Sequence, residues 1–172
     1  MIVSALPPLL FLDVDGPLIP FGATSAQVPH GYPTYPLDGM PPGAEANPLL
    51  ARLDPALGPR LAALPCELVW ATTWMADANA CVAPRLGLPP LPVVDWPEPS
   101  EEDGRARLHW NTRALSRWAA GRSFAWVDDE ITDADRAWVA AHHDRPCLLR
   151  RVDARLDLTD ADFAALSAWL RP

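Results

Sequence analysis

The stretch Leu9-Leu10-Phe11-Leu12-Asp13-Val14-Asp15-Gly16 decides the fold that we expect for this chain. Four consecutive apolar residues are typical of a strand that is covered on both faces, as in a parallel sheet. Two carboxylates one residue apart follow at once, and extended spacing lets their side chains and the carbonyl between them gather around one point. Gly16 lets the chain turn away sharply. The segment predicts a buried strand with an acidic site at its carboxyl end.

Two later segments repeat this form, an apolar run that ends in polar residues. In open α/β sheets the carboxyl ends of parallel strands meet at the crevice where ligands bind. We therefore expect the polar residues after all three runs to face one site. The two later runs and their polar ends are 67–71 with Thr72 and Thr73, and 123–127 with Asp128 and Asp129.

Amphipathic segments between the runs predict an α/β fold with a central, mainly parallel sheet between two helical layers, a Rossmann-like three-layer sandwich. Two Thr-Asp-Ala-Asp sequences are expected to cap helices. Residues 17–47 are rich in Pro and Gly, and we expect a flap or loop insertion there within a single domain, 1–172. The expected helices are 55–64, 75–86, 112–120, 133–142 and 160–170, and shorter strands are expected at 92–94 and 147–149.

The composition limits the partners that we expect. The 172 residues include 14 basic and 22 acidic side chains, for a formal charge of −8, so strong nucleic-acid binding is not expected. A phosphorylated small molecule remains compatible with this charge, because one metal ion and a few arginines can form a local positive site. No lysine occurs in the chain, so arginine is the basic residue besides the four histidines.

Cysteine usage and hydropathy indicate a cytoplasmic protein. Three cysteines without paired spacing argue against a disulfide framework and a zinc site. The first residues do not resemble a secretory signal, and no apolar run has the roughly 18 residues that a membrane span requires. The sequence gives no prediction of oligomeric state.

The strand-end residues supply the groups that phosphoryl transfer requires: an anionic nucleophile, a second acid for the leaving oxygen, donors for the phosphoryl oxygens and cations against the charge. Asp13 and Asp15 are the two acids. Thr72 can offer a hydroxyl and a backbone N–H to a phosphate. Asp128 and Asp129 can complete an oxygen-rich site of the kind that Mg²⁺ prefers.

Three segments resemble motifs of the haloacid dehalogenase (HAD) superfamily: Phe11 to Gly16 resembles motif I, Val69 to Thr72 motif II, and Ala125 to Asp129 motif IV. The sequences Trp70 to Trp74 and Trp126 to Glu130, around the last two motifs, are similar to those of small actinobacterial HAD-like proteins. The resemblance implies a HAD-like fold whose minimal cap is the insertion at 17–47. It implies a magnesium-dependent phosphohydrolase that forms an aspartyl-phosphate on a small phosphate ester.

The resemblance also implies a role for each matching residue. Asp13 would be the nucleophile and a magnesium ligand, and Asp15 the general acid/base that also offers its carbonyl to magnesium. Thr72, with Thr73 beside it, would bind the phosphoryl group. Asp128 would bind magnesium directly or through water, with Asp129 in support.

Motif III departs from the family pattern. The family has a lysine, or sometimes an arginine, at the start of the helix before the last acidic strand, whereas this chain has Asn111 there. Arg113 is the nearest cation, but two residues along a helix correspond to about 200° of rotation. We expect Asn111 and Arg113 to be the candidates for the phosphate side of the site. Loss of the cation would weaken charge stabilisation.

Other functions stay open at this stage. A catalytically weakened HAD-like module that binds magnesium or a partner is the alternative that Asn111 suggests. A phosphotransferase or a dehalogenase would use the same Asp13 chemistry. A signalling receiver domain is disfavoured by Thr72 and by the absence of lysine. Trp74 and Trp110, next to the motifs, are the tryptophans that we expect to line the site, whereas His109 is expected to be a surface or hydrogen-bonded residue.

Overall fold

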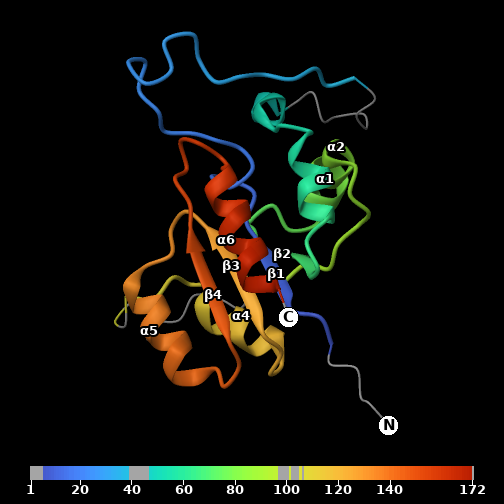
Figure 1. Ribbon diagram of the computed structural model, residues 1–172. Helices are drawn as coiled ribbons and strands as arrows, with labels where there is room; N and C mark the ends of the chain where they lie inside the picture. Colours follow the sequence, from blue (N-terminus) through green and yellow to red (C-terminus); the bar gives the residue numbers. More distant parts are fainter. Residues whose placement is uncertain (1–5, 39–46, 97–100, 102–104, 106, 172) are drawn as a thin grey trace.

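The computed structural model describes residues 6–38, 47–96, 101, 105 and 107–171. Its strands and helices alternate along the chain (Figure 1). The strands are β1 (Leu9–Leu12), β2 (Glu67–Trp70), β3 (Phe124–Asp128) and β4 (Cys147–Arg151). The helices are η2 (Pro48–Arg52), α1 (Leu57–Ala62), η3 (Ala78–Val82), α2 (Ala83–Leu86), α4 (Thr112–Ala119), α5 (Asp133–His142) and α6 (Asp160–Leu170).

The four strands form one parallel sheet in the order β2-β1-β3-β4. β1 lies between β2 and β3, with Leu12 opposite Trp70 on one side and Val127 on the other. All four residues of β1 are buried, as its unbroken apolar run predicts. The α/β fold class and the parallel sheet expected from the sequence are confirmed.

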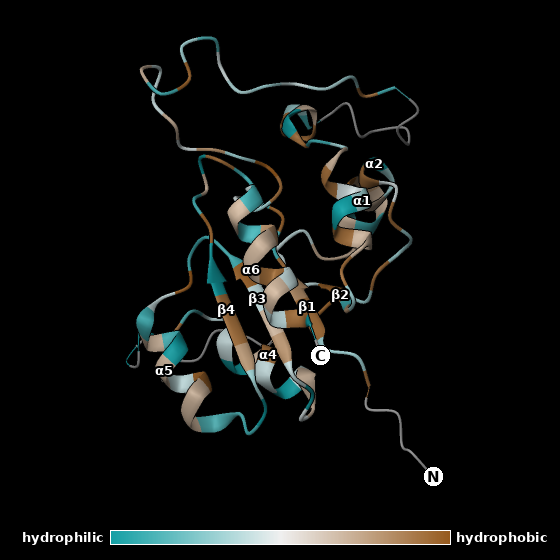
Figure 2. Cartoon of the chain, in the orientation of Figure 1, coloured by the Kyte–Doolittle hydropathy of each residue, from teal (hydrophilic) through white to brown (hydrophobic). Residues whose placement is uncertain are grey.

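Each face of the sheet has its own hydrophobic core because successive residues of a strand point to opposite sides. Leu10 and Leu12 pack with buried residues of α1, α2 and α6, whereas Leu9 and Phe11 pack with those of α4 and α5. Figure 1 shows α6 in front of the sheet and α4 behind it, and Figure 2 shows hydrophobic residues along the strands between these layers. The sheet is therefore the middle of three layers.

Two expected elements differ from the prediction. The expected strand 92–94 is a single bridge, in which Val93 is paired with Trp70. The expected helix 75–86 is divided into the π-helical turn η3 and the short α2, which has Pro84 in its first turn. Proline lacks the N–H that a continuous α-helix requires, so the regular ladder cannot run through this point.

The two Thr-Asp-Ala-Asp sequences begin α5 and α6 as expected. In each, the threonine hydroxyl accepts a hydrogen bond from the backbone N–H three residues on, and the aspartate returns the contact, which completes a capping box. The predicted ranges of both helices agree with the structure.

The described part of the insertion, residues 17–38, forms turns and extended segments above the carboxyl edge of the sheet (Figure 1). Residues 39–46 of the predicted flap lie outside the described residues. Arg52 donates to the carbonyl of Pro20, and Arg85 donates to those of Tyr35 and Pro36, so two guanidinium groups fasten the insertion to the body. No described helix has the length and apolar character needed to cross a membrane.

Candidate active site

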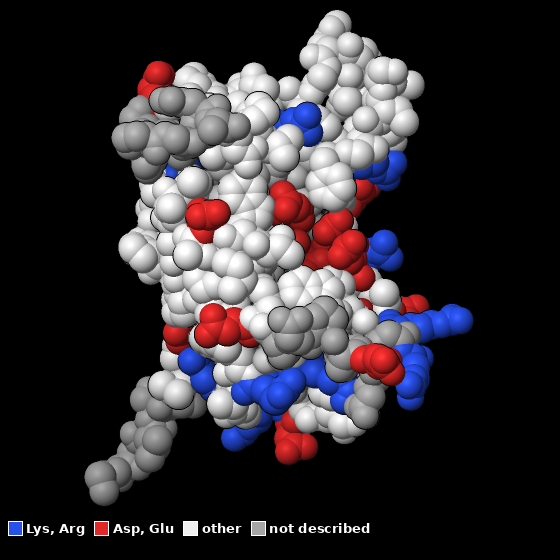
Figure 3. Space-filling view, turned by 180° about the vertical axis from the view of Figure 1, so that it is seen from behind, with Lys and Arg blue, Asp and Glu red and all other residues white. Residues whose placement is uncertain are grey.

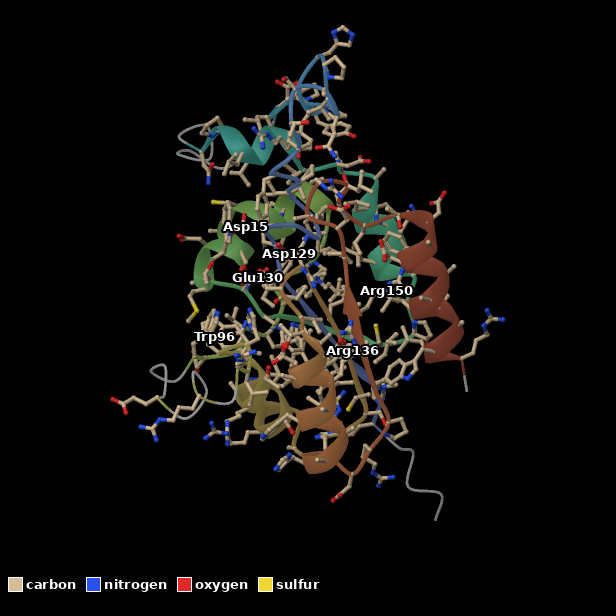
Figure 4. All side chains as sticks on the ribbon, turned by 90° about the vertical axis from the view of Figure 1, so that its left-hand side faces the viewer. Asp15, Trp96, Asp129, Glu130, Arg136 and Arg150 are labelled. Atoms are coloured by element: carbon tan, nitrogen blue, oxygen red, sulfur yellow. The ribbon has the colours of Figure 1, made fainter. Side chains whose placement is uncertain are left out.

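The carboxyl ends of β1 and β3 lie side by side at the point where the chain changes direction along the sheet. The connection after β1 leads to β2 on one side, and the connection after β3 leads to β4 on the other. Such a switch point leaves a crevice at the strand ends. Asp15 follows β1, Asp129 and Glu130 follow β3, and Figure 4 shows these three close together.

Asp13 is the first side chain beyond β1. Its Oδ1 accepts a hydrogen bond from the backbone N–H of Val14 at 2.7 Å. Burial raises the pKa of Asp13 well above its ordinary value, the charge of Asp128 raises it further, and a hydrogen bond with the Thr72 side chain opposes the rise. A bound cation would stabilise the ionised form that a nucleophile requires.

Asp15 is oriented by an aromatic donor from another element. The indole Nε1 of Trp74 donates to Oδ2 of Asp15 at 3.0 Å. Trp74 was expected to line the site, and its contact with Asp15 joins the end of β1 to the loop after β2. This contact fixes the carboxyl group of the second acid.

Gly16 makes the sharp turn that the sequence predicts. Its φ is +90°, in the region that favours glycine, and a Cβ built there would be 2.8 Å from Cγ of Asp129. Any side chain at position 16 would therefore displace the carboxylate of Asp129. The turn and the acidic pair after β3 fit together only because this position lacks a Cβ.

Asp128 and Asp129 supply the third part of the site. Oδ1 of Asp128 accepts the backbone N–H of Glu130 at 2.8 Å. Burial, followed by the charge of Asp128, raises the pKa of Asp129 to about 6. Burial also raises the pKa of Asp128. Closely spaced, partly dehydrated carboxylates of this kind gain from a hard divalent cation.

The donor set fits such a cation. One oxygen from each of Asp13, Asp128 and Asp129 lies within 4.8 Å of the others. Oxygen ligands are those that Mg²⁺ prefers. A second group with similar spacing contains His109, Asp128 and Glu130, in which the histidine would favour a softer metal.

These side chains line one cavity of about 160 Å³. Five carboxylic acids and one histidine contribute to its wall, and Figure 3 shows acidic side chains gathered in a hollow on this face of the molecule. The residues that line the cavity are Asp13, Asp15, Phe21, Thr73, His109, Trp110, Asn111, Asp128, Asp129 and Glu130.

Only two of the four phosphate-binding candidates line the cavity. Thr73 and Asn111 line the cavity, whereas the buried Thr72 does not line it and contacts Asp13 from beside it. Arg113 also does not line the cavity, because its guanidinium lies over the ring of Trp138 on α5, 5.3 Å from the centroid. The structure therefore does not bring Arg113 into the place of the motif III cation.

Asn111 is the N-cap of α4 and is 2% exposed. Its amide oxygen is buried and has no hydrogen-bond partner among the described residues. An unpaired buried amide is costly, which makes this group available to a substrate or an ordered water.

His109 lines the cavity with a side chain that is only 8% exposed, so of the two places expected for it, at the surface or in hydrogen bonds, the structure shows the second. Its Nδ1 accepts the backbone N–H of Asn111 at 3.3 Å, and its Nε2 lies 3.2 Å from Oε2 of Glu130. The assignment that satisfies both contacts places the proton on Nε2. Asp135 accepts the backbone N–H of His109 at 2.7 Å, so the cap of α5 also holds this histidine.

Three of these residues were missed or underrated from the sequence. Phe21 belongs to the insertion and has no motif around it, and Glu130 lies just beyond motif IV. His109 is two residues from the motif III position, and this closeness was the one signal that could have given it a role. Trp110 lines the cavity as expected and stacks on His109, with ring centroids 5.8 Å apart.

A comparison with protein families gives one match: residues 9–163 match the family described as the HAD domain in Swiss Army Knife RNA repair proteins. Neither the curated proteins nor the solved structures contain a match. The matched range includes all four strands and every candidate site residue.

Proposed function

Since the chain belongs to the family of HAD domains in Swiss Army Knife RNA repair proteins, we propose that it is a magnesium-dependent phosphomonoesterase that forms an aspartyl-phosphate. The membership confirms the resemblance read from the sequence and identifies a HAD-like hydrolase. The observation that carries the finer proposal is the convergence of Asp13, Asp15 and the pair after β3 on one cavity at the switch point.

In the proposed first step, a carboxylate oxygen of Asp13 attacks phosphorus. The O–P bond to Asp13 forms while the bond to the leaving oxygen breaks, and Asp15 gives that oxygen its proton. The N–H of Val14 holds Oδ1 of Asp13, and the indole of Trp74 holds Oδ2 of Asp15. These two contacts keep the two acids in fixed orientations during the transfer.

In the second step, Asp15 takes a proton from water, which attacks phosphorus and releases phosphate and Asp13. The hydroxyl of Thr73 and the amide Nδ2 of Asn111 would donate to the phosphoryl oxygens from the cavity wall, whereas the unpaired Oδ1 of Asn111 can only accept. Bound at Asp13, Asp128 and Asp129, Mg²⁺ would supply charge neutralisation for the phosphoryl group. His109 is the one cation-capable side chain among the described residues that line the cavity.

Two kinds of substrate agree with this site. The acidic composition favours a small phosphate ester, as expected from the sequence. The family's description favours the phosphate end of an RNA, which is also a phosphomonoester. The formal charge of −8 is compatible with an RNA end if contacts are confined to the few residues around the cavity.

Phosphate release tests the proposal. Small phosphate esters, nucleotides and phosphorylated RNA strands are incubated with the protein, with and without Mg²⁺. We expect magnesium-dependent release that Asp13→Asn reduces by at least about 1,000-fold, because it removes the nucleophile. Asp144→Asn, at an exposed position outside the cavity, is the matched control and should retain activity.

Release that is equal in the native protein and in Asp13→Asn would reject the mechanism. Binding of Mg²⁺ without release from any ester would favour the catalytically weakened module instead, with the missing motif III cation as its physical reason.

A further inference from the structure

The cavity at Asp13 is too small for a whole nucleotide. Its volume is about 160 Å³, whereas pockets that enclose an organic ligand have roughly 300–1,000 Å³. A phosphoryl group and a cation would occupy most of this space. The organic part of the proposed substrate must therefore lie outside the cavity.

A second cavity of about 540 Å³ adjoins the first, because Phe21 and Asp129 line both. It lies between the beginning of the insertion and the loop after β4. The residues that line it are Phe21, Gly22, Asp129, Arg151, Val152, Asp153, Ala154 and Arg155. A group attached to a phosphoryl centre near Asp13 can extend from one cavity into the other.

Backbone hydrogen bonds hold the walls of the second cavity in place. The N–H of Phe21 donates to the carbonyl of Ala154 at 2.8 Å, which joins its two sides. The N–H of Val152 donates to the carbonyl of Asp128 at 3.1 Å, which ties the same loop to the catalytic strand end. The cavity is thus formed without a ligand, as is usual for binding sites.

Two arginines and two aspartates line this cavity, and of the two arginines only Arg155 forms a salt bridge with a described residue. Nε of Arg151 donates to the carbonyl of Asp129 at 2.9 Å, and Arg151 forms no ion pair with another described residue. Arg155 is instead neutralised by Asp153, with contacts of 2.9 and 2.6 Å. The exposed guanidinium of Arg151 is therefore positioned by the main chain. It also interacts electrostatically with Asp129, and a cation bound at Asp129 would leave the charge of Arg151 for a ligand.

Phe21 gives the cavity an aromatic wall. The residue is 42% exposed and lines the cavity, so a ligand there can contact its ring. A planar base can stack on such a ring, and base stacking on aromatic side chains contributes about 1–3 kcal/mol per base. The ring and Arg151 are on the wall of the same cavity.

We propose that the second cavity binds a second phosphate of the substrate, the phosphodiester that follows the terminal nucleotide of a nucleic-acid strand, with Arg151 on that phosphate and Phe21 against the base. This inference rests on the proposed phosphomonoesterase function. It takes the strand end that the family's description favours and assigns a second binding site for it. It explains how a protein with an acidic surface could recognise a strand end through one local cation.

The test compares a mononucleotide with trinucleotides that carry a terminal phosphate at the 5′ or the 3′ end. For at least one end, we expect kcat/KM of the strand to exceed that of the mononucleotide at least tenfold at low salt. Arg151→Gln should lower this ratio about tenfold. Arg171→Gln, at the end of α6 and outside both cavities, is the matched control and should leave the ratio unchanged.

A second measurement does not depend on turnover. In the Asp13→Asn background, fluorescence anisotropy of a labelled trinucleotide should show at least fivefold weaker binding after Arg151→Gln. If both substrates are hydrolysed and the kcat/KM of the strand is close to that of the mononucleotide, the proposed role of the second cavity is wrong and the proposed phosphatase activity stands. If neither substrate is hydrolysed but binding depends on Arg151, the proposed phosphatase activity is wrong and the proposed binding site stands. Equal binding by both arginine variants would reject the role of Arg151.

Discussion

The indole of Trp74 and the carboxylate of Asp15 are 59 residues apart in the chain and 3.0 Å apart in space. A hydrogen bond from a neutral ring orients an acid without placing a second charge beside it. Asp15 then has a fixed orientation at the cavity, as its proposed role as the acid requires. The contact also explains why a tryptophan follows the second threonine of the loop after β2.

Trp74→Phe tests this positioning role, because it retains the ring and removes the donor. We expect kcat to fall about tenfold, equivalent to roughly 1.4 kcal/mol of transition-state stabilisation, while KM changes by less than about twofold. Steady-state kinetics on the best ester of the panel provide the measurement. Trp169→Phe on α6, outside the cavity, should leave kcat unchanged. An unchanged kcat in Trp74→Phe would show that Asp15 needs no such donor.

The acids of the site could be predicted from the sequence, whereas their partners could not. Asp13, Asp15, Asp128 and Asp129 each follow an apolar run, and the geometry of a parallel sheet brings such ends together. Trp74 reaches Asp15, and Phe21 reaches Ala154 in the loop after β4, only through tertiary packing. No period or local spacing encodes those contacts.

At the scale of elements, the shortest helices depend most on packing. α1 has six residues and α2 four, fewer than an isolated helix requires for stability in water. They lie against each other at Gly58, where a Cβ would be 1.7 Å from the carbonyl oxygen of Leu86. Their approach depends on the absence of a side chain at this position.

Gly58→Ala should therefore lower the free energy of unfolding by about 3 kcal/mol, because backbone atoms of α2 must move to admit the methyl group. Urea denaturation measures the loss. Ala62→Gly at an exposed site of the same helix is the control, with an expected cost of about 1 kcal/mol. A smaller loss in Gly58→Ala than in the control would contradict the close packing of α1 on α2.

The same dependence on packing limited the prediction of elements. β1, β3, α5 and α6 agree with the sequence because an apolar run or a capping box specifies each of them locally. The π-helical turn η3 arises where Asn79 accepts from the indole of Trp70 and from the N–H of Leu91. These contacts come from residues outside the helix, whereas Pro84 is the local signal for the break and was not used in the prediction.

For the whole molecule, the excess of acidic groups places carboxylates close enough to repel one another away from the active site. Asp157 is partly buried, and burial, followed by the charges of Asp54 and Asp162, raises its pKa to about 6. Its native pKa is thus above the unfolded value near 3.9. The stability that this group contributes is full below pH 4 and is lost as the pH rises through 6.

Asp157→Asn should remove this dependence. The variant should be more stable than the native protein at pH 7.5, by at most about 1 kcal/mol after allowance for solvent screening, and the difference should vanish near pH 4. Asparagine also tolerates the φ of +54° at this position. Thermal unfolding of both proteins across this range is the measurement, and a constant difference at all pH values would reject the assignment to Asp157.

Gly16 and Asp129 are so close that a Cβ at position 16 would lie 2.8 Å from Cγ of Asp129. Substitutions at these two positions are therefore not independent of each other. A residue with a side chain at 16 would be strained by the φ of +90° and would also displace the carboxylate of Asp129, which offers one oxygen to the candidate cation site. We therefore expect that related chains which keep Asp129 also keep glycine at position 16.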